Sequence, residues 1–217
     1  LTVTNIAGNP VIFGAAVGSS RALLALNVTG NTTLTGDVST LNDQSYSATV
    51  TLAAATVLNK TSSTSTIAIA GAIDGAFAFT ISAATFTSNP AQTVRLGSSI
   101  GASTALSSLA ITGPVQFSGT SITTTGAQTY NSAIRIANHT TFNTTNSANT
   151  FAQIDGTSPN AQGVTINDGT GATNFNQAIG AVVPLAYLIS NGTGATTLRG
   201  NINVSGNVSV AAPLTLA

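Results

Sequence analysis

The sequence predicts an all-β fold, a β-solenoid in which parallel strands stack coil upon coil. Three observations predict it: an internal repeat of about 81 residues, short runs that alternate apolar and polar residues, and turn residues every six to ten positions. Charged residues make up 5% of the chain and hydrophobic residues 42%, so apolar side chains for a core are abundant. We therefore expect a folded stack of repeated units.

The repeat is clearest between residues 13–36 and 96–119, which align without a gap at a spacing of 83 residues. A third, looser copy starts at Phe175 and contains a two-residue insertion. The predicted repeat phases are 1–12 (partial), 13–95, 96–174 and 175–217 (partial), within one solenoid domain over 1–217. Matching pairs in the first two copies are Val17/Ile100, Gly18/Gly101, Leu23/Leu106, Leu26/Leu109, Val28/Ile111, Gly30/Gly113 and Leu34/Phe117.

Two further phrases recur downstream. Residues 44–46 (Gln-Ser-Tyr) return as 128–130 (Gln-Thr-Tyr), and the triplet Ile-Asp-Gly at 73–75 returns at 154–156. Charge does not recur, because Arg21 aligns with Thr104 and Lys60 with Thr144. The repeat thus preserves apolar character and turn chemistry. Both ends of the chain fall inside a repeat, so we expect either a slice of a longer array or subunits that stack end to end.

Alternating runs such as 47–52, 77–81 and 201–204 predict short strands, separated by turns such as 28–31 and 167–169. The stretches 52–58 and 136–142 are also interpreted as strands, since neither has the pattern of a helix. Such strands suit a sandwich, a barrel or a solenoid, and the long repeat favours the solenoid. A unit of about 81 residues holds roughly four coils of about 20 residues, stacked about 4.8 Å apart.

Three phrases resemble known repeats: residues 106–113 (LSSLAITG), 123–131 (TTTGAQTYN) and 175–180 (FNQAIG). They are similar to repeats of filamentous-haemagglutinin-like, β-strand-repeat bacterial surface proteins. The resemblance covers nearly the whole chain and implies a right-handed β-helix, export to the cell surface, and a role as a stalk, filament or adhesin. The secretion domain and adhesive tip of that family do not match any part of this sequence.

No catalytic, cofactor-binding or metal-binding residues are predicted. His139, the only histidine, is expected at the surface or in a turn, and without it neither a zinc site nor a Ser/His/Asp triad is available. The five aspartates are expected to be turn residues, and no calcium-loop motif is present. Asp74, Asp155 and Asp168 each precede glycine, while Asp37 and Asp43 flank a loop.

Partners are limited by the same composition. Five scattered cations, Arg21, Lys60, Arg95, Arg135 and Arg199, do not form the basic patch that nucleic acid needs. No run is long enough for a transmembrane helix, and cysteine is absent. Tryptophan is absent too, and of the three tyrosines Tyr46 and Tyr130 share one repeat phase, which favours a structural role. Glycosylation sequons occur at Asn27, Asn31, Asn59, Asn138, Asn143, Asn191, Asn203 and Asn207.

These features predict a structural module of an extracellular filament, stalk or cell-surface fibre, without cofactors and without enzymatic activity. Its expected partner is itself, by end-to-end stacking or by continuation of the same chain. The alternative is an adhesin that binds host or matrix glycans or proteins through the solenoid faces. A β-helix enzyme acting on polysaccharide is the remote alternative, because glycoside hydrolysis generally needs two carboxylates at a defined separation.

Overall fold

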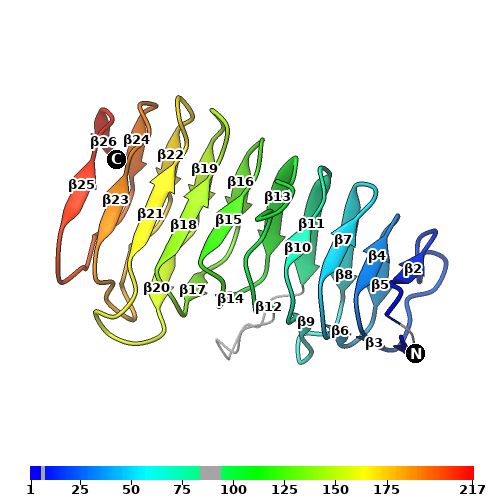
Figure 1. Ribbon diagram of the computed structural model, residues 1–217. Coiled ribbons are helices and arrows are strands. Elements are labelled where there is room, and N and C mark those ends of the chain that lie inside the picture. The colour runs from blue at the N-terminus through cyan, green and yellow to red at the C-terminus, as the bar shows by residue number, and fades with distance from the viewer. Residues whose placement is uncertain (6–7, 84–93) are drawn as a thin grey trace.

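The computed structural model describes residues 1–5, 8–83 and 94–217 and shows ten coils stacked into a β-solenoid (Figure 1). Every strand pair in this part of the chain is parallel, as predicted, and each pair joins strands of successive coils. No helix occurs among the described residues. Residues 84–93, inside the predicted repeat phase 13–95, lie outside the described residues.

Three faces surround the core, here called sheets A, B and C, and one coil visits them in that order. Sheet A contains β1 (Thr2–Thr4), β3 (Leu26–Thr29), β6 (Gln44–Tyr46), β9 (Ile67–Ile69), β12 (Val94–Leu96), β14 (Val115–Phe117), β17 (Ile134–Ile136) and β20 (Ile154–Gly156).

Sheet B is formed by two groups of strands. The first group is β2 (Val11–Phe13), β4 (Thr32–Leu34), β7 (Val50–Leu52) and β10 (Ile73–Asp74). The second group is β15 (Ser121–Thr123), β18 (Thr140–Asn143), β21 (Val164–Asn167), β23 (Leu188–Ser190) and β25 (Val208–Val210).

Sheet C contains β5 (Val38–Thr40), β8 (Thr56–Lys60), β11 (Ala78–Ala83), β13 (Ser108–Thr112), β16 (Gln128–Tyr130), β19 (Asn149–Phe151), β22 (Thr173–Phe175), β24 (Thr196–Leu198) and β26 (Leu214–Leu216).

Most strands have three residues, of which the first and third are buried and the second faces out. β14 shows the pattern, with Val115 and Phe117 buried and Gln116 at the surface. The stretches 52–58 and 136–142 were predicted to be strands, and the prediction is correct only in part: each contains the end of one strand, a turn and the start of the next. Because successive side chains of a strand point to opposite sides, this alternation supplies each coil with two inward side chains per face. The inward positions form one continuous apolar core along the stack.

The sequence repeat corresponds to eleven strand positions, one fewer than four full coils. Leu26 lies in β3 of sheet A, whereas its repeat partner Leu109 lies in β13 of sheet C. Leu188, the equivalent residue of the third copy, lies in β23 of sheet B. The prediction of roughly four coils per repeat is therefore refined to three and two-thirds. Each copy is rotated by one face relative to the copy before it.

A five-residue loop interrupts one strand position in each copy. It spans 18–22 beside sheet C, 101–105 beside sheet B and 180–184 beside sheet A. In the second copy, Ile100 and Leu106 flank the loop and bridge to Ile122 and Thr124 of the next coil. The backbone between those two partners, Thr123, donates to Ile100 O at 2.9 Å and accepts from Leu106 N at 3.2 Å. The other two loops repeat this pattern, so one residue of the next coil spans the base of each loop.

The repeated Ile-Asp-Gly triplet caps the loop of the following coil. Asp74 Oδ1 accepts hydrogen bonds from the backbone N–H groups of Ser103 at 2.9 Å and Thr104 at 3.1 Å. Asp155 Oδ1 accepts in the same way from Val182 at 2.9 Å and Val183 at 3.3 Å. The recurrence of this triplet thus follows from a contact between coils.

Gly101 opens its loop at φ +66°, and a Cβ at this position would lie 2.1 Å from Thr123 O. A left-handed backbone costs a residue with a Cβ roughly 1–2 kcal/mol. Gly101→Ala is expected to lower the free energy of unfolding by more than this, because the Cβ would also clash with Thr123 O. Urea denaturation measures the loss. Gly14→Ala is the control, because its Cβ would meet nothing within 4 Å; equal effects of the two substitutions would contradict this account.

Asp74→Ala should lower stability by about 1–3 kcal/mol, because two loop N–H groups lose their charged acceptor. Hydrogen exchange at Ser103 and Thr104 should become faster. Asp74→Asn retains a carbonyl oxygen and should lose less. Unchanged exchange at these two amides in the alanine variant would show that the carboxylate does not hold the loop.

Candidate functional site

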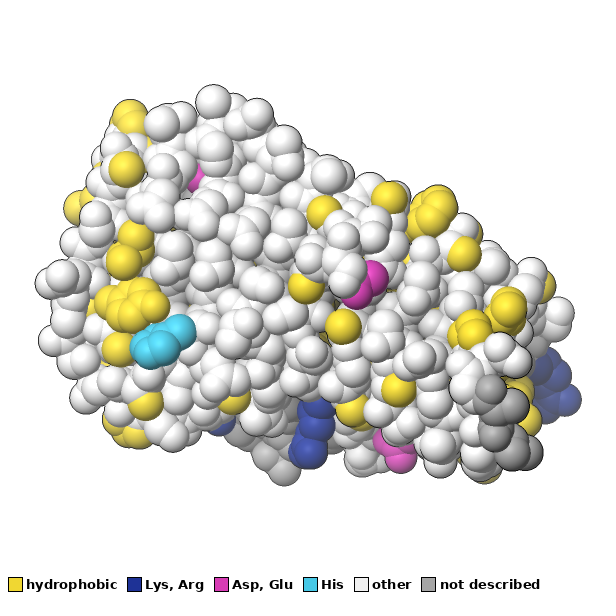
Figure 2. All heavy atoms as spheres, in the orientation of Figure 1, with side chains coloured by type: hydrophobic (Ala, Val, Ile, Leu, Met, Phe, Trp, Pro, Cys, Tyr) yellow, Lys and Arg dark blue, Asp and Glu magenta, His cyan; other side chains and the backbone are white. Residues whose placement is uncertain are grey.

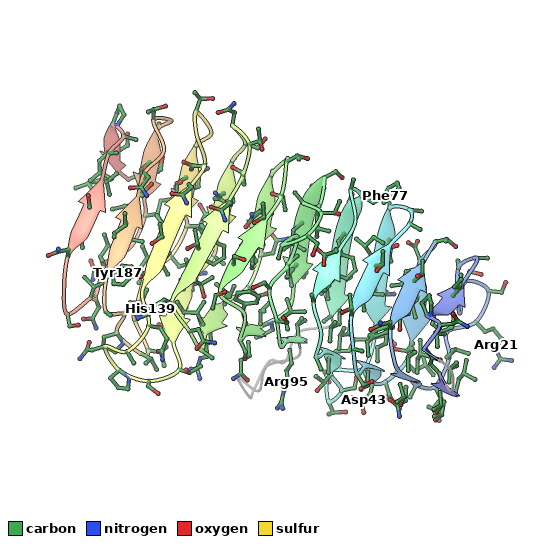
Figure 3. The ribbon with its side chains drawn as sticks, viewed as in Figure 1. Arg21, Asp43, Phe77, Arg95, His139 and Tyr187 are labelled. Carbon is green, nitrogen blue, oxygen red and sulfur yellow. The ribbon has the colours of Figure 1, made fainter. Side chains whose placement is uncertain are left out.

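His139, the only histidine, lies at the surface just before β18, as predicted. Its Nδ1 accepts a hydrogen bond from the backbone N–H of Gly163 at 3.0 Å. Its ring stacks on Tyr187, with ring centroids 5.4 Å apart and an interplanar angle of 19° (Figures 2 and 3). Counted from the N-terminus, coil 7 contains β17–β19, coil 8 contains β20–β22, and coil 9 contains β23 and β24. His139, Gly163 and Tyr187 therefore link coils 7, 8 and 9 along the outside of sheet B. An Nδ1 that accepts an N–H donates no proton.

Carboxylates in the described residues act as acceptors for the backbone of the next coil. Asp37 Oδ1 accepts from Val57 N at 2.8 Å, and Asp43 Oδ1 accepts from Thr66 N at 2.7 Å. No group of three or more His, Cys, Asp or Glu side chains that could hold a metal forms within the described ranges. Four of the five aspartates, these two with Asp74 and Asp155, therefore share one structural role.

Two aspartates predicted to be turn residues are buried. Asp155 and Asp168 are each 1% exposed. Asp168 does precede a turn, since Gly169 has φ +59°, but its side chain points into the solenoid and accepts a hydrogen bond from Thr173 Oγ1. Burial raises the pKa of Asp168 above its ordinary value. The turn prediction is wrong for Asp74 and Asp155, which lie in strands β10 and β20 and accept hydrogen bonds from a loop of the next coil. The Asp-Gly sequence also does not reveal the direction of the Asp168 side chain.

The two equivalent tyrosines belong to two copies of one buried network. Tyr46 Oη donates to Gln44 Oε1 at 3.2 Å, and Tyr130 Oη donates to Gln128 Oε1 at 3.0 Å. Burial raises the pKa of both tyrosines, and both are 1% exposed, which leaves them no contact with a ligand. The glutamine Nε2 groups donate to equivalent backbone oxygens, at 2.7 Å to Asn59 and at 2.8 Å to Asn143.

An asparagine ladder runs along the outside at the ends of the strands of sheet B. Asn167 Nδ2 donates to Asn143 Oδ1 at 2.9 Å, and Asn191 Nδ2 donates to Asn167 Oδ1 at 2.9 Å. In-register stacking of identical amides on adjacent coils makes this possible. Asn143 and Asn191 also head sequons, and the Asn143 amide is already engaged in the ladder.

A shallow groove of about 370 Å³ crosses the outside of sheet A over β6, β9 and β12. It forms because Ala68 lies in register between Ser45 and the longer Arg95. A neighbouring hollow of about 340 Å³ also borders Arg95 and includes Asp43 (Figure 3). Tyr46, the aromatic residue of the groove lining, is buried, so the groove offers no aromatic platform for a sugar ring.

No family model matches the chain, and no curated protein or solved structure matches it either. No helix in the described residues is long and apolar enough to cross a membrane. The fold and the contacts above are therefore the observations from which a function is proposed.

Tyr130→Phe should lower the free energy of unfolding by about 1–2 kcal/mol, because Gln128 Oε1 remains buried without its donor. Urea denaturation measures the loss. The equivalent variant Tyr46→Phe shows whether the two copies of the network contribute equally to stability. Tyr187→Phe, at the surface, is the control and should change stability by less than about 0.5 kcal/mol. A negligible effect at both buried positions would contradict a structural role for the network.

Proposed function

We propose that this chain is a structural module of an extracellular filament, stalk or cell-surface fibre, and that it is not an enzyme. The observation that carries the proposal is the ten-coil stack itself, in which the recurring aspartates Asp74 and Asp155 make contacts between coils. On the face shown in Figure 2, charged side chains are few and scattered, in line with a charged content of 5%. The coils are joined by backbone hydrogen bonds along one axis, so rigidity along that axis is the property that the fold supplies.

Two apolar residues of the last coil are the ones that axial association would cover. Leu214 is 48% exposed and Leu216 is 76% exposed. Both lie in β26, in register with the inward residues Thr196 and Leu198 of β24. A further coil would bury them, whether it comes from the same polypeptide or from a second copy, and would pair the exposed strand edge.

Electron microscopy and fibre diffraction of the native material test the proposal. Long unbranched fibres are expected, with a meridional reflection near 4.8 Å from coils stacked along the fibre axis. Ten coils correspond to about 48 Å of fibre length at this spacing. Dispersed globular particles without that reflection would contradict the filament.

Axial association through the last coil is tested with the purified chain by light scattering against concentration. Leu216→Lys places a charge among the apolar side chains at the end of the stack and should reduce end-to-end association. Phe77→Lys is the matched control, because Phe77 is 39% exposed and lies just before β11, away from both ends of the stack. Equal behaviour of both variants would argue against association through β26.

The groove on sheet A supports a second candidate, an adhesin that binds glycans or matrix proteins through a solenoid face. Arg95 is its exposed cation and would contact an acidic group of such a ligand. A screen against acidic glycans and matrix proteins with Arg95→Ala tests this role, with the exposed Arg21→Ala as control. Binding that is absent, or that survives Arg95→Ala, would contradict a binding role for this groove.

A further inference from the structure

The unpartnered buried polar side-chain atoms of the described residues gather at one corner of the solenoid. They are Asn149 Nδ2 and Oδ1, Asp168 Oδ1, Ser190 Oγ and Thr196 Oγ1. All four residues lie where coils 7 to 9 turn from sheet B to sheet C, and each is at most 2% exposed. Buried polar groups without partners are rare and costly, so a concentration of them at one place calls for a ligand.

The strand register stacks these residues along the axis. Asn149, Thr173 and Thr196 open β19, β22 and β24 and pair in register, one above the other. Asp168 precedes β22, and its Oδ2 accepts from Thr173 Oγ1. The other carboxylate oxygen, Oδ1, reaches toward coil 9, where a Cβ on Gly192 would collide with it. Coil 9 is also the coil that supplies Ser190 and Thr196.

Oxygen atoms dominate this corner. The atoms without a partner include one carboxylate oxygen and two hydroxyl oxygens on adjacent coils. No charged side chain is among the causes of the raised pKa of Asp168. Hard cations prefer such oxygen ligands. Calcium sites usually combine several carboxylates, whereas this corner has one, so a single positive charge would neutralise it.

We propose that this corner binds one monovalent alkali cation between two adjacent coils, held by Asp168 Oδ1 with Ser190 Oγ and Thr196 Oγ1. Glycine at position 192 leaves room for the carboxylate to reach the coil above it. The cation joins two successive coils through their side chains, in addition to their backbone hydrogen bonds.

Thermal unfolding in matched concentrations of sodium, potassium, calcium or tetramethylammonium chloride tests the proposal. Tetramethylammonium is too large for the site and keeps the ionic strength constant. Sodium or potassium should raise the midpoint by about 5–10 °C when present at a hundredfold excess over its dissociation constant. Asp168→Asn should abolish this difference between salts, and Asp155→Asn, which changes a buried carboxylate elsewhere, should retain it.

The dependence on pH distinguishes a bound cation from a protonated carboxyl. Burial raises the pKa of Asp168 in the folded state above its ordinary value of 3.8. Without alkali cation, the stability of the wild-type protein should therefore fall as pH rises from about 3.8 through the raised pKa. The stability of Asp168→Asn, measured alongside, should not show this fall. A bound cation compensates the ionised carboxylate, so sodium or potassium should remove most of that fall. Asp168→Asn should show neither effect.

Crystals grown in rubidium chloride provide the direct readout. Anomalous density between Asp168 and Thr196 is expected in the wild-type protein and should be absent in Asp168→Asn. Identical unfolding midpoints in all salts, together with no anomalous density, would overturn the proposal and leave ordered water as the partner of these atoms. Stabilisation by calcium alone would overturn the assignment to a monovalent cation.

Discussion

Each coil of this protein is hydrogen-bonded along its backbone to the coils on either side of it, and the spacing of parallel strands brings equivalent side chains close together. A charged residue in this setting faces its neighbours at short range, and a row of like charges would repel. The low charge content of the chain suits this geometry. Apolar residues, amides and hydroxyls gain from the same stacking, as the ladder of Asn143, Asn167 and Asn191 shows.

The contacts between coils also explain what the repeat conserves. Gly101 and its equivalents permit a loop to leave the wall, and Asp74 or Asp155 binds the loop from the coil before it. The Gln–Tyr pairs fill the interior while satisfying their own polar atoms. These residues recur because they fit a coil to its neighbour, which is why apolar character and turn chemistry repeat while exposed charge does not.

The fold could be predicted from the sequence because its main signals are local. Alternation in strands such as Val115–Phe117 and glycine at turns such as Gly30 are set by backbone geometry within a few residues. The rotation of successive copies could not be predicted, since an alignment reports distance along the chain and not the face on which a residue lies. The burial of Asp168 could not be predicted for a similar reason. Its neighbours are Thr173 and residues of the next coil, and stacking of the coils decides which residues these are.

A repeat of eleven strand positions wound on three faces cannot return to its starting face after one copy. The loops at 18–22, 101–105 and 180–184 consequently emerge in three directions, one per face, at successive heights. Such a rod has no front or back with respect to these loops. Molecules that approach the rod from different sides would meet these loops at different heights along the axis. Lateral contacts made through the loops would therefore be distributed helically around the rod and would not form a single adhesive stripe.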